Sequence, residues 1–295
     1  MKRNLKELQE ESISIIRETV SNSYKPVVLF SIGKDSTVLL DLFKKAFYPL
    51  DIPVKFLHID TGWKFSEMIK FKLQIAKKYK IDLDTYQNKK DYKRVNPFYD
   101  SNYTDLMKTK ALKDALDIQK YDFVFGGARR DEEGSRSKEK ILSHRSNFHI
   151  WTPENQRLEP WNLFNYEKKD NESFRVFPLS NWTEINIWEY IKDSNLKVVP
   201  LYFAKERKVV IKDNEIFLYD DKRFILSPND KVKKLKIRFR TLGCYPLTAG
   251  VESSADTVDK IIRELKKSKN SERAGRKIDL DKIGSMELKK REGYF

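Results

Sequence analysis

The chain has 295 residues, which allows one large domain or one domain with an extension. Its 35% charged content is typical of a water-soluble chain, and its formal net charge is +15. A single cysteine excludes an internal disulfide framework and a zinc site built from several thiolates. The first twenty residues have the pattern of an amphipathic helix and not of a signal peptide, and no stretch is apolar for long enough to span a membrane. We therefore expect a cytoplasmic protein.

The positive charge has three interpretations: a nucleic-acid partner, anionic small substrates, or a general bias of composition toward lysine. Lysine is scattered over most of the chain, whereas arginine is less frequent and clustered. The sequence shows no recognised nucleic-acid-binding module and no basic stripe interleaved with aromatic residues. A nucleic-acid-binding protein is thus the weaker alternative, and it predicts binding that falls steeply with salt.

The first 127 residues alternate apolar runs with helical periodicity, starting with a surface helix docked by one face. This alternation at crossover spacing predicts the α/β class, with a doubly wound, mostly parallel sheet. Strands are expected at 27–30, 54–60, 81–87 and 122–127, and helices at 5–20, 38–46, 64–79 and 104–121.

After residue 126 the pattern loosens into a polar loop and then a mixed, partly irregular region. The next helix is expected to begin after Thr183, a good N-cap, with Glu184 in its first turn. A hairpin is expected over 208–221, with Asp213 and Asn214 at its turn, and a helix over 254–268. We predict an ATP-binding α/β domain at 1–203, and at 204–295 an extension with the hairpin, a helix and a mobile basic tail.

A candidate phosphate-binding loop follows the first expected strand, in the order Ser-Ile-Gly-Lys-Asp-Ser. Gly33 would let the backbone approach an anion, and the following helix offers unpaired N–H groups and the positive end of its dipole. The loop is not a Walker motif, because Val28 and Asp35 stand where that motif needs glycine and a hydroxyl. The alternative is an ordinary capped helix start. The residues expected to bind ATP phosphates are Ser31, Gly33, Lys34, Asp35 and Ser36.

Two further polar stretches follow later strands, at the sheet edge where ligands bind in such folds. Asp60, Thr61 and Gly62 end the second strand and are expected to bind ATP. His58 lies inside the strand and is expected to be a hydrogen-bonded core histidine. The alternative for this stretch is a plain polar turn.

The fourth strand leads into a loop with three arginines, whose guanidinium groups suit sulfate or phosphate oxygens. The alternative is a solvated loop in which arginines pair with the adjacent acidic residues. Its place at the edge of the sheet favours anion binding by Arg129, Arg130 and Arg136.

Together these blocks resemble the PP-loop pyrophosphatase group, which splits ATP between its α and β phosphates. The resemblance extends over the whole chain to the sulfate adenylyltransferase subunit 2 family, the small catalytic subunits of heteromeric bacterial ATP sulfurylases. It is carried by the runs SIGKDST, HIDTGWKF, VNPF, FGGARRDEEGSRSKE, FPLSNWTEINIWEYI, VPLYFA, RFRTLGCYPLTAGVES, SERAGRKID and GSMELKKREGYF. The hairpin region departs most from the family pattern, but it does not include the nucleotide loop.

The resemblance implies that ATP and sulfate give adenosine 5′-phosphosulfate and pyrophosphate, the first step of sulfate assimilation. It places Asp60 near the nucleoside, Lys34 at the phosphates, and Arg129 and Arg130 on sulfate or the departing pyrophosphate. It also implies Mg²⁺ bound with ATP, no dedicated protein metal site, and a heterodimer with a GTPase large subunit that supplies GTP hydrolysis.

A tail segment with two arginines around a glycine is expected to fold over the site. Its arginines are Arg273 and Arg276.

Two related groups fit less well. Phosphosulfate reductases need a cysteine near the C-terminus, and some carry an iron–sulfur cluster held by four cysteines. Here Cys244 is the single thiol, so we expect a packing residue. PP-loop tRNA-modifying enzymes usually bring further cysteines or an RNA-binding module, neither of which is present. The remaining alternative is a PP-loop adenylating enzyme with another acceptor.

Overall fold

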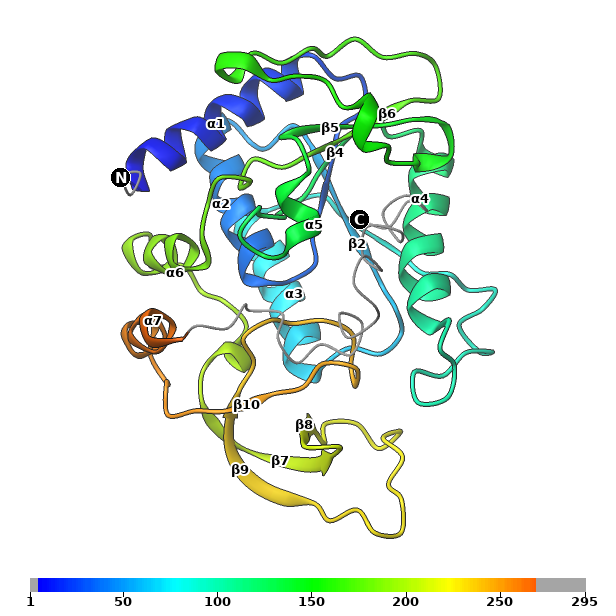
Figure 1. Ribbon diagram of the computed structural model, residues 1–295, viewed down its shortest axis with the longest axis vertical. Helices are drawn as coiled ribbons and strands as arrows, with labels where there is room; N and C mark the ends of the chain where they lie inside the picture. Colours follow the sequence, from blue (N-terminus) through cyan, green and yellow to red (C-terminus); the bar gives the residue numbers. More distant parts are fainter. Residues whose placement is uncertain (1–4, 269–295) are drawn as a thin grey trace.

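The computed structural model describes residues 5–268, which form two sheets with helices packed around the larger one (Figure 1). The larger sheet has six strands in the order β3-β2-β1-β4-β6-β5, and the smaller has four in the order β10-β9-β7-β8. The strands of the larger sheet are β1 (Val27–Leu29), β2 (Lys55–Ile59), β3 (Leu83–Tyr86), β4 (Phe123–Phe125), β5 (Leu142–Arg145) and β6 (Ser173–Val176). Those of the smaller sheet are β7 (Lys205–Lys212), β8 (Glu215–Leu218), β9 (Lys233–Arg238) and β10 (Val251–Glu252).

The larger sheet is parallel except for β5, which pairs antiparallel with β6 at one edge. This confirms the predicted α/β class with a mostly parallel sheet. The helices are α1 (Leu5–Ser21), α2 (Lys34–Phe47), α3 (Ser66–Tyr79), α4 (Ala111–Gln119), α5 (Gly134–Ser137), α6 (Glu184–Asp193) and α7 (Val258–Lys267). A π-helical stretch, η1 (Asp105–Lys110), leads directly into α4.

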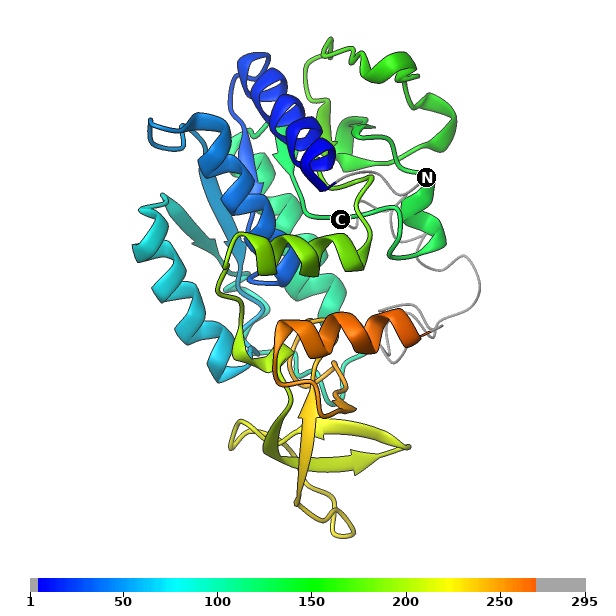
Figure 2. The same cartoon turned by 90° about the vertical axis from the view of Figure 1, so that its left-hand side faces the viewer.

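Helices cover both faces of this sheet, as a parallel sheet requires. The apolar sides of α1, α2, α3 and α6 join one large hydrophobic core, and α4 packs with Val27, Leu57 and Val124 in a second, smaller core. Figure 2 shows α1, α2 and α3 on the near side of the sheet, with α4 behind it.

The strand order reverses between β1 and β4. From β1 the chain passes through α2 to β2, whereas β4 joins β1 from the other side. The crevice at such a reversal, outside the carboxyl ends of the strands, is where ligands bind in doubly wound folds. The loops after β1 and β4 are therefore neighbours, although about 100 residues separate them along the chain.

The C-terminal part is built on the predicted hairpin. Asp213 and Asn214 join β7 to β8 with φ angles of 50° and 61°, the left-handed values that a tight type I′ hairpin turn needs. The helix α7 packs against α6, where Lys192 and Asp259 form an ion pair at 2.7 Å. The division at residue 203 stays a prediction, and the large hydrophobic core includes residues on both sides of it.

The N-terminus of α6 confirms its predicted cap. The Thr183 hydroxyl accepts a hydrogen bond from the backbone N–H of Asn186 at 3.2 Å. The side-chain oxygen of Asn186 accepts one from the backbone N–H of Thr183 at 2.9 Å. This reciprocal pair satisfies two backbone donors at the helix start.

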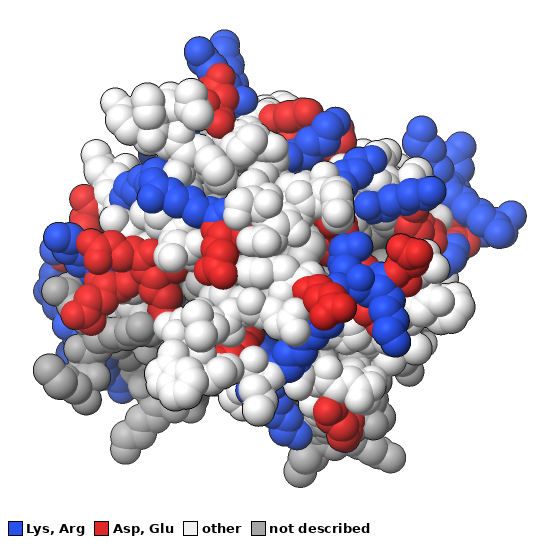
Figure 3. Space-filling model, turned by 90° about the horizontal axis from the view of Figure 1, so that it is seen from above, with Lys and Arg blue, Asp and Glu red and all other residues white. Residues whose placement is uncertain are grey.

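Positive and negative side chains alternate on the face that Figure 3 shows, and no band of a single sign crosses that face. The surface seen there does not form the continuous basic stripe that nucleic-acid binding uses. Within residues 5–268, no helix combines the length and the apolar character needed to cross a bilayer.

Candidate active site

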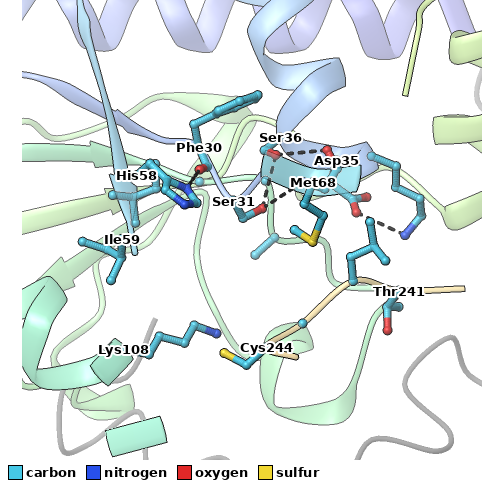
Figure 4. Close-up of a pocket in the computed structure, with 18 of the residues that line it drawn as sticks. Phe30, Ser31, Asp35, Ser36, His58, Ile59, Met68, Lys108, Thr241 and Cys244 are labelled. Atoms are coloured by element: carbon cyan, nitrogen blue, oxygen red, sulfur yellow. Dashed lines mark hydrogen bonds and ion pairs between the residues drawn. The ribbon is translucent and has the colours of Figure 1, made fainter. Parts of the chain in front are cut away.

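A cavity of about 220 Å³ opens at the carboxyl ends of β1, β2 and β4. All five residues of the predicted phosphate loop line it, as do Thr61 from the loop after β2 and Gly127 from the loop after β4. Residues 241–244, which follow β9 in the C-terminal part, close its other side. Figure 4 shows Ser31, Asp35 and Ser36 on one wall and Lys108 and Cys244 on the opposite one.

The phosphate loop turns sharply at Ile32, which has a φ angle of 68° and a side chain only 1% exposed. A β-branched residue in this left-handed region is strained, and such strain is held in place only by its surroundings. The turn brings the chain to Gly33, the N-cap of α2. The Ser36 and Thr37 hydroxyls both donate to the Gly33 carbonyl, at 3.0 and 2.9 Å. The start of α2 is thus held by hydrogen bonds from side chains of its own first turn.

Nothing in the protein itself requires glycine at position 33. Its φ angle is −78°, and an added Cβ would lie 3.4 Å from both the Ser31 and Tyr202 hydroxyl oxygens, which is ordinary contact. The next amide, that of Lys34, donates to the Tyr202 hydroxyl at 2.8 Å. Tyr202 therefore links the start of α2 to the segment that leads into the smaller sheet.

Asp35 lies between two cations. Its Oδ2 accepts from Lys34 Nζ at 3.1 Å, and its Oδ1 accepts from Arg129 Nε at 2.8 Å. Lys34 and Arg129 are each 1% exposed. The aspartate that sets this loop apart from a Walker motif thus joins the phosphate loop to the arginine loop.

Gly127 makes the same junction possible. An added Cβ would lie 3.1 Å from the Asp35 carbonyl carbon and 3.2 Å from the Ser36 nitrogen, closer than backbone atoms easily allow. The loop after β4 therefore packs directly against the first turn of α2.

The three arginines after β4 have different surroundings. Arg129 is buried behind the phosphate loop in its pair with Asp35, and its Nη1 also lies 3.4 Å from Asp131 Oδ2. Arg130 donates from Nη1 to the Asn181 side chain at 2.7 Å. Among the described residues that line the cavity, Arg136 is the one arginine, and it pairs with Glu133 and Glu139 at 3.5 and 3.4 Å. Anion binding by Arg129 and Arg130 stays a prediction, and neither is among the described residues that line the cavity.

The turn after β2 is held by its own side chains. The Asp60 Oδ1 accepts from the Gly62 amide at 2.8 Å, and its Oδ2 accepts from the Gln87 amide group at 3.2 Å. Gly62 has a φ angle of 80° and an added Cβ would collide with the Tyr92 ring, so this position needs glycine. Thr61 lines the cavity, whereas neither Asp60 nor Gly62 is among the described residues that do.

His58 is the core histidine that the sequence predicts. It is 2% exposed, and its Nδ1 lies 2.8 Å from the Phe30 carbonyl oxygen, to which it donates when the ring is neutral. Burial, together with Lys64 nearby, lowers the pKa of His58 to about 3. Arg273 and Arg276 lie outside the described residues.

Several known proteins similar to this chain share one name. A sulfate adenylyltransferase subunit 2 of Geobacter metallireducens is 53% identical over 99% of this chain and 98% of its own. The corresponding proteins of Acinetobacter baumannii and Mesorhizobium japonicum are 53% and 54% identical, again over 99% of this chain and over 97% and 98% of theirs. The chain belongs to the sulfate adenylyltransferase subunit 2 family. Its residues 25–250 also match the phosphoadenosine phosphosulfate reductase domain.

Solved structures of other proteins resemble this chain in fold. A Candida glabrata FMN adenylyltransferase in complex with FAD and inorganic pyrophosphate aligns over 92% of this chain and 89% of its own, with a TM-score of 0.51 and 15% identity. The same protein with FMN and an ATP analogue aligns with a TM-score of 0.50 at 15% identity. At this identity the likeness concerns the fold alone.

In this chain, sequence reasoning missed part of the cavity wall. Lys64, Lys108 and Tyr202 line the cavity. Cys244 packs against the large hydrophobic core, as expected, and its partly buried side chain also lines the cavity. The signal was present for three of them, since Lys64, Tyr202 and Cys244 lie in the runs HIDTGWKF, VPLYFA and RFRTLGCYPLT that carry the family resemblance. For Lys108, on a helix with several lysines, no sequence signal was available.

Proposed function

We propose that this chain is the catalytic subunit of a sulfate adenylyltransferase, which converts ATP and sulfate to adenosine 5′-phosphosulfate and pyrophosphate. The observation that carries the proposal is the 53% identity, over 99% of the chain, to relatives bearing that name. The geometry supports it, because the loop and the helix start that would receive phosphates lie at the strand-order reversal, where nucleotides bind in this class of fold.

The triphosphate would bind at the start of α2. Helix N–H groups and the positive end of the dipole attract phosphate oxygens there, and Lys34 adds a full charge. No contact within the protein requires a glycine at position 33, so the room that Gly33 leaves would serve the ligand. Ser31, Asp35 and Ser36 complete this wall of the cavity.

In the reaction, a sulfate oxygen attacks the α-phosphorus of ATP. The bond from that phosphorus to the oxygen bridging to the β-phosphate breaks, and pyrophosphate leaves with the bonding electrons. No protein nucleophile is needed, so the chain contributes by positioning two polyanions and neutralising their charge. Arg136, which faces the cavity, suits the pyrophosphate, whereas Arg129 serves this site by holding Asp35.

We propose that Mg²⁺ enters with ATP, where it would neutralise phosphate charge. Within residues 5–268, no three histidine, cysteine or acidic side chains gather into a metal-binding group. Mg²⁺ in nucleotide sites takes most of its ligands from phosphates and water. Asp35 and Glu132 are the carboxylates that face the cavity.

The relatives' name, subunit 2, supports assembly with another subunit. We propose that this subunit is a GTPase whose GTP hydrolysis drives the unfavourable formation of the phosphosulfate anhydride, in the cytoplasm.

Asp60 and Thr61 are proposed near the nucleoside. Asp60 would act there by shaping the turn through the hydrogen bond that its side chain accepts from the Gly62 amide.

The function is tested by mixing the purified chain and its partner subunit with ATP, Mg²⁺ and GTP, with and without sulfate, and measuring pyrophosphate. We expect release that depends on sulfate. Release that is independent of sulfate, or that requires a different acceptor, would contradict the proposal and favour another PP-loop adenylating enzyme.

The phosphate loop is tested by Lys34→Ala. Loss of one charge at the reacting phosphates should lower kcat/KM by roughly 100-fold. The control is Lys44→Ala on the same helix, whose side chain pairs with exposed Asp51 at 3.7 Å, and which should retain activity. Equal melting temperatures would show that both variants are folded. Full activity in Lys34→Ala would remove Lys34 from the site.

A further inference from the structure

The cavity has cations on two opposite walls. Four cationic side chains line it among residues 5–268: Lys34, Lys64, Lys108 and Arg136. Lys34 pairs with Asp35 on the phosphate-loop wall, and Arg136 pairs with Glu133 and Glu139. Lys64 and Lys108 come from other elements, the loop after β2 and the π-helical stretch η1.

Lys64 is the cation least neutralised by the protein. Within residues 5–268 its side chain makes no hydrogen bond and no ion pair. Among the charged groups that act on it, Lys108 and Lys72 lower its pKa and Asp60 raises it. Burial is the largest influence and leaves the pKa of Lys64 below its ordinary value. A partly buried ammonium without a counter-ion is costly, so an anion in this position would be stabilised.

Lys108 approaches the same region from the other side. Figure 4 shows its amine next to the Cys244 sulfur, across the cavity from Ser31 and Ser36. Lys108 also lowers the pKa of Lys64, which places the two ammonium groups within electrostatic reach of each other. Two ammonium groups suit a ligand with two negative charges.

Reaction geometry decides which anion this is. In an in-line displacement the attacking and leaving oxygens lie on opposite sides of the phosphorus. With the pyrophosphate held at the start of α2, the acceptor must approach from the wall that faces it. We infer that Lys64 and Lys108 form the subsite of the acceptor sulfate, opposite the phosphate loop. This inference rests on the proposed function.

The kinetic test uses the complete enzyme with its partner subunit and the variants Lys64→Met and Lys108→Met. Each should raise the KM for sulfate roughly 10- to 100-fold, the loss expected for one charge-assisted hydrogen bond. The KM for ATP should change by less than about twofold, because the phosphate loop is intact. Lys72→Met is the matched control, since it removes the same charge near Lys64 from a residue outside the cavity lining.

A second test does not depend on turnover. At neutral pH the chain is treated briefly with acetic anhydride, and acetylation of each lysine is read by mass spectrometry. Sodium sulfate should protect Lys64 and Lys108 but not Lys72, and sodium chloride at the same ionic strength should protect none of them. A non-hydrolysable ATP analogue should not replace the effect of sulfate on Lys64 and Lys108.

The outcomes separate the two proposals. Protection by sulfate without sulfate-dependent pyrophosphate release would contradict the proposed function but still support a subsite that binds an oxyanion. Sulfate-dependent release with an unchanged KM for sulfate and no protection would overturn the subsite. An equal rise in the KM for ATP and for sulfate would assign both lysines to the nucleotide instead.

Discussion

Asp35 stands where a Walker loop has a hydroxyl, and its carboxylate holds Lys34 on one side and Arg129 on the other. The Arg129 side chain is fully buried, and the carboxylates of Asp35 and Asp131 both lie within ion-pair distance of it. A Walker hydroxyl serves the metal directly, whereas this aspartate holds two cations of the protein in place. The residue therefore shapes the site through its neighbours.

Removing Asp35 should destabilise the fold. In Asp35→Ala the buried Arg129 loses a counter-ion, which typically costs about 3 kcal/mol of unfolding free energy. Asp84→Ala, which breaks an exposed pair with Lys55 at 3.6 Å, should cost less than about 1 kcal/mol. Urea unfolding of the two variants measures the difference. Equal losses would mean that the contact between Asp35 and Arg129 adds nothing beyond a surface pair.

His58 makes stability depend on pH. Burial lowers its pKa to about 3 in the folded chain, against 6.5 when exposed, so the unfolded chain binds more protons between these values. Its contribution to stability is therefore complete above pH 6.5 and is lost progressively as the pH falls toward 3.

The His58→Gln variant measures this contribution. Between pH 6 and 5 the wild type should lose up to about 1.4 kcal/mol more unfolding free energy than the variant. His149, whose pKa burial also lowers, to about 4, keeps a slope of the same sign in both chains. Urea unfolding at each pH provides the free energies. Identical slopes would show that His58 is not buried as a neutral ring.

At the scale of elements, the contact between the loop after β4 and the start of α2 determines the position of the phosphate loop. Gly127 allows this contact, because a side chain there would meet the backbone of Asp35 and Ser36 at 3.1–3.2 Å. Two loops about 100 residues apart in the chain thus share one junction at the sheet edge.

Gly127→Ala should weaken both stability and ATP binding. Forcing the two backbones apart costs about 1–3 kcal/mol, as overpacking usually does. Gly134→Ala is the control, since an added Cβ at Gly134 would meet nothing within 4 Å. Thermal unfolding and titration with ATP give both quantities. A Gly127→Ala variant with unchanged ATP affinity would show that the junction does not position the loop.

Local signals made some elements predictable and left others hidden. Thr183 and the Asp213–Asn214 turn act within a few residues, so their helix and hairpin were readable from the sequence. The strand β5 was missed because its four residues lie in a polar region and are specified by pairing with β6. The π-helical geometry of η1 was missed because six residues are too few for their spacing to distinguish a π-helix from an α-helix.

At the scale of the whole molecule, the cavity belongs to both parts of the chain. The larger sheet supplies the phosphate loop, and residues 241–244 after β9 supply the facing wall. The sequence predicted the first wall because loop residues adjoin their strands. It could not predict the second, since nothing local shows that Lys108 and Cys244 lie across from residue 31. The fold was thus more predictable than the site.

The single cysteine of the chain lies on this shared wall. Every thiol-directed reagent must therefore report from the cavity, so a fluorescent or fluorine-bearing label needs no prior removal of other thiols. We expect ATP and sulfate together to slow the alkylation of Cys244 by iodoacetamide, measured by mass spectrometry. An unchanged rate would show that the filled cavity leaves this wall open. The chain thus carries its own attachment point for following substrate arrival in real time.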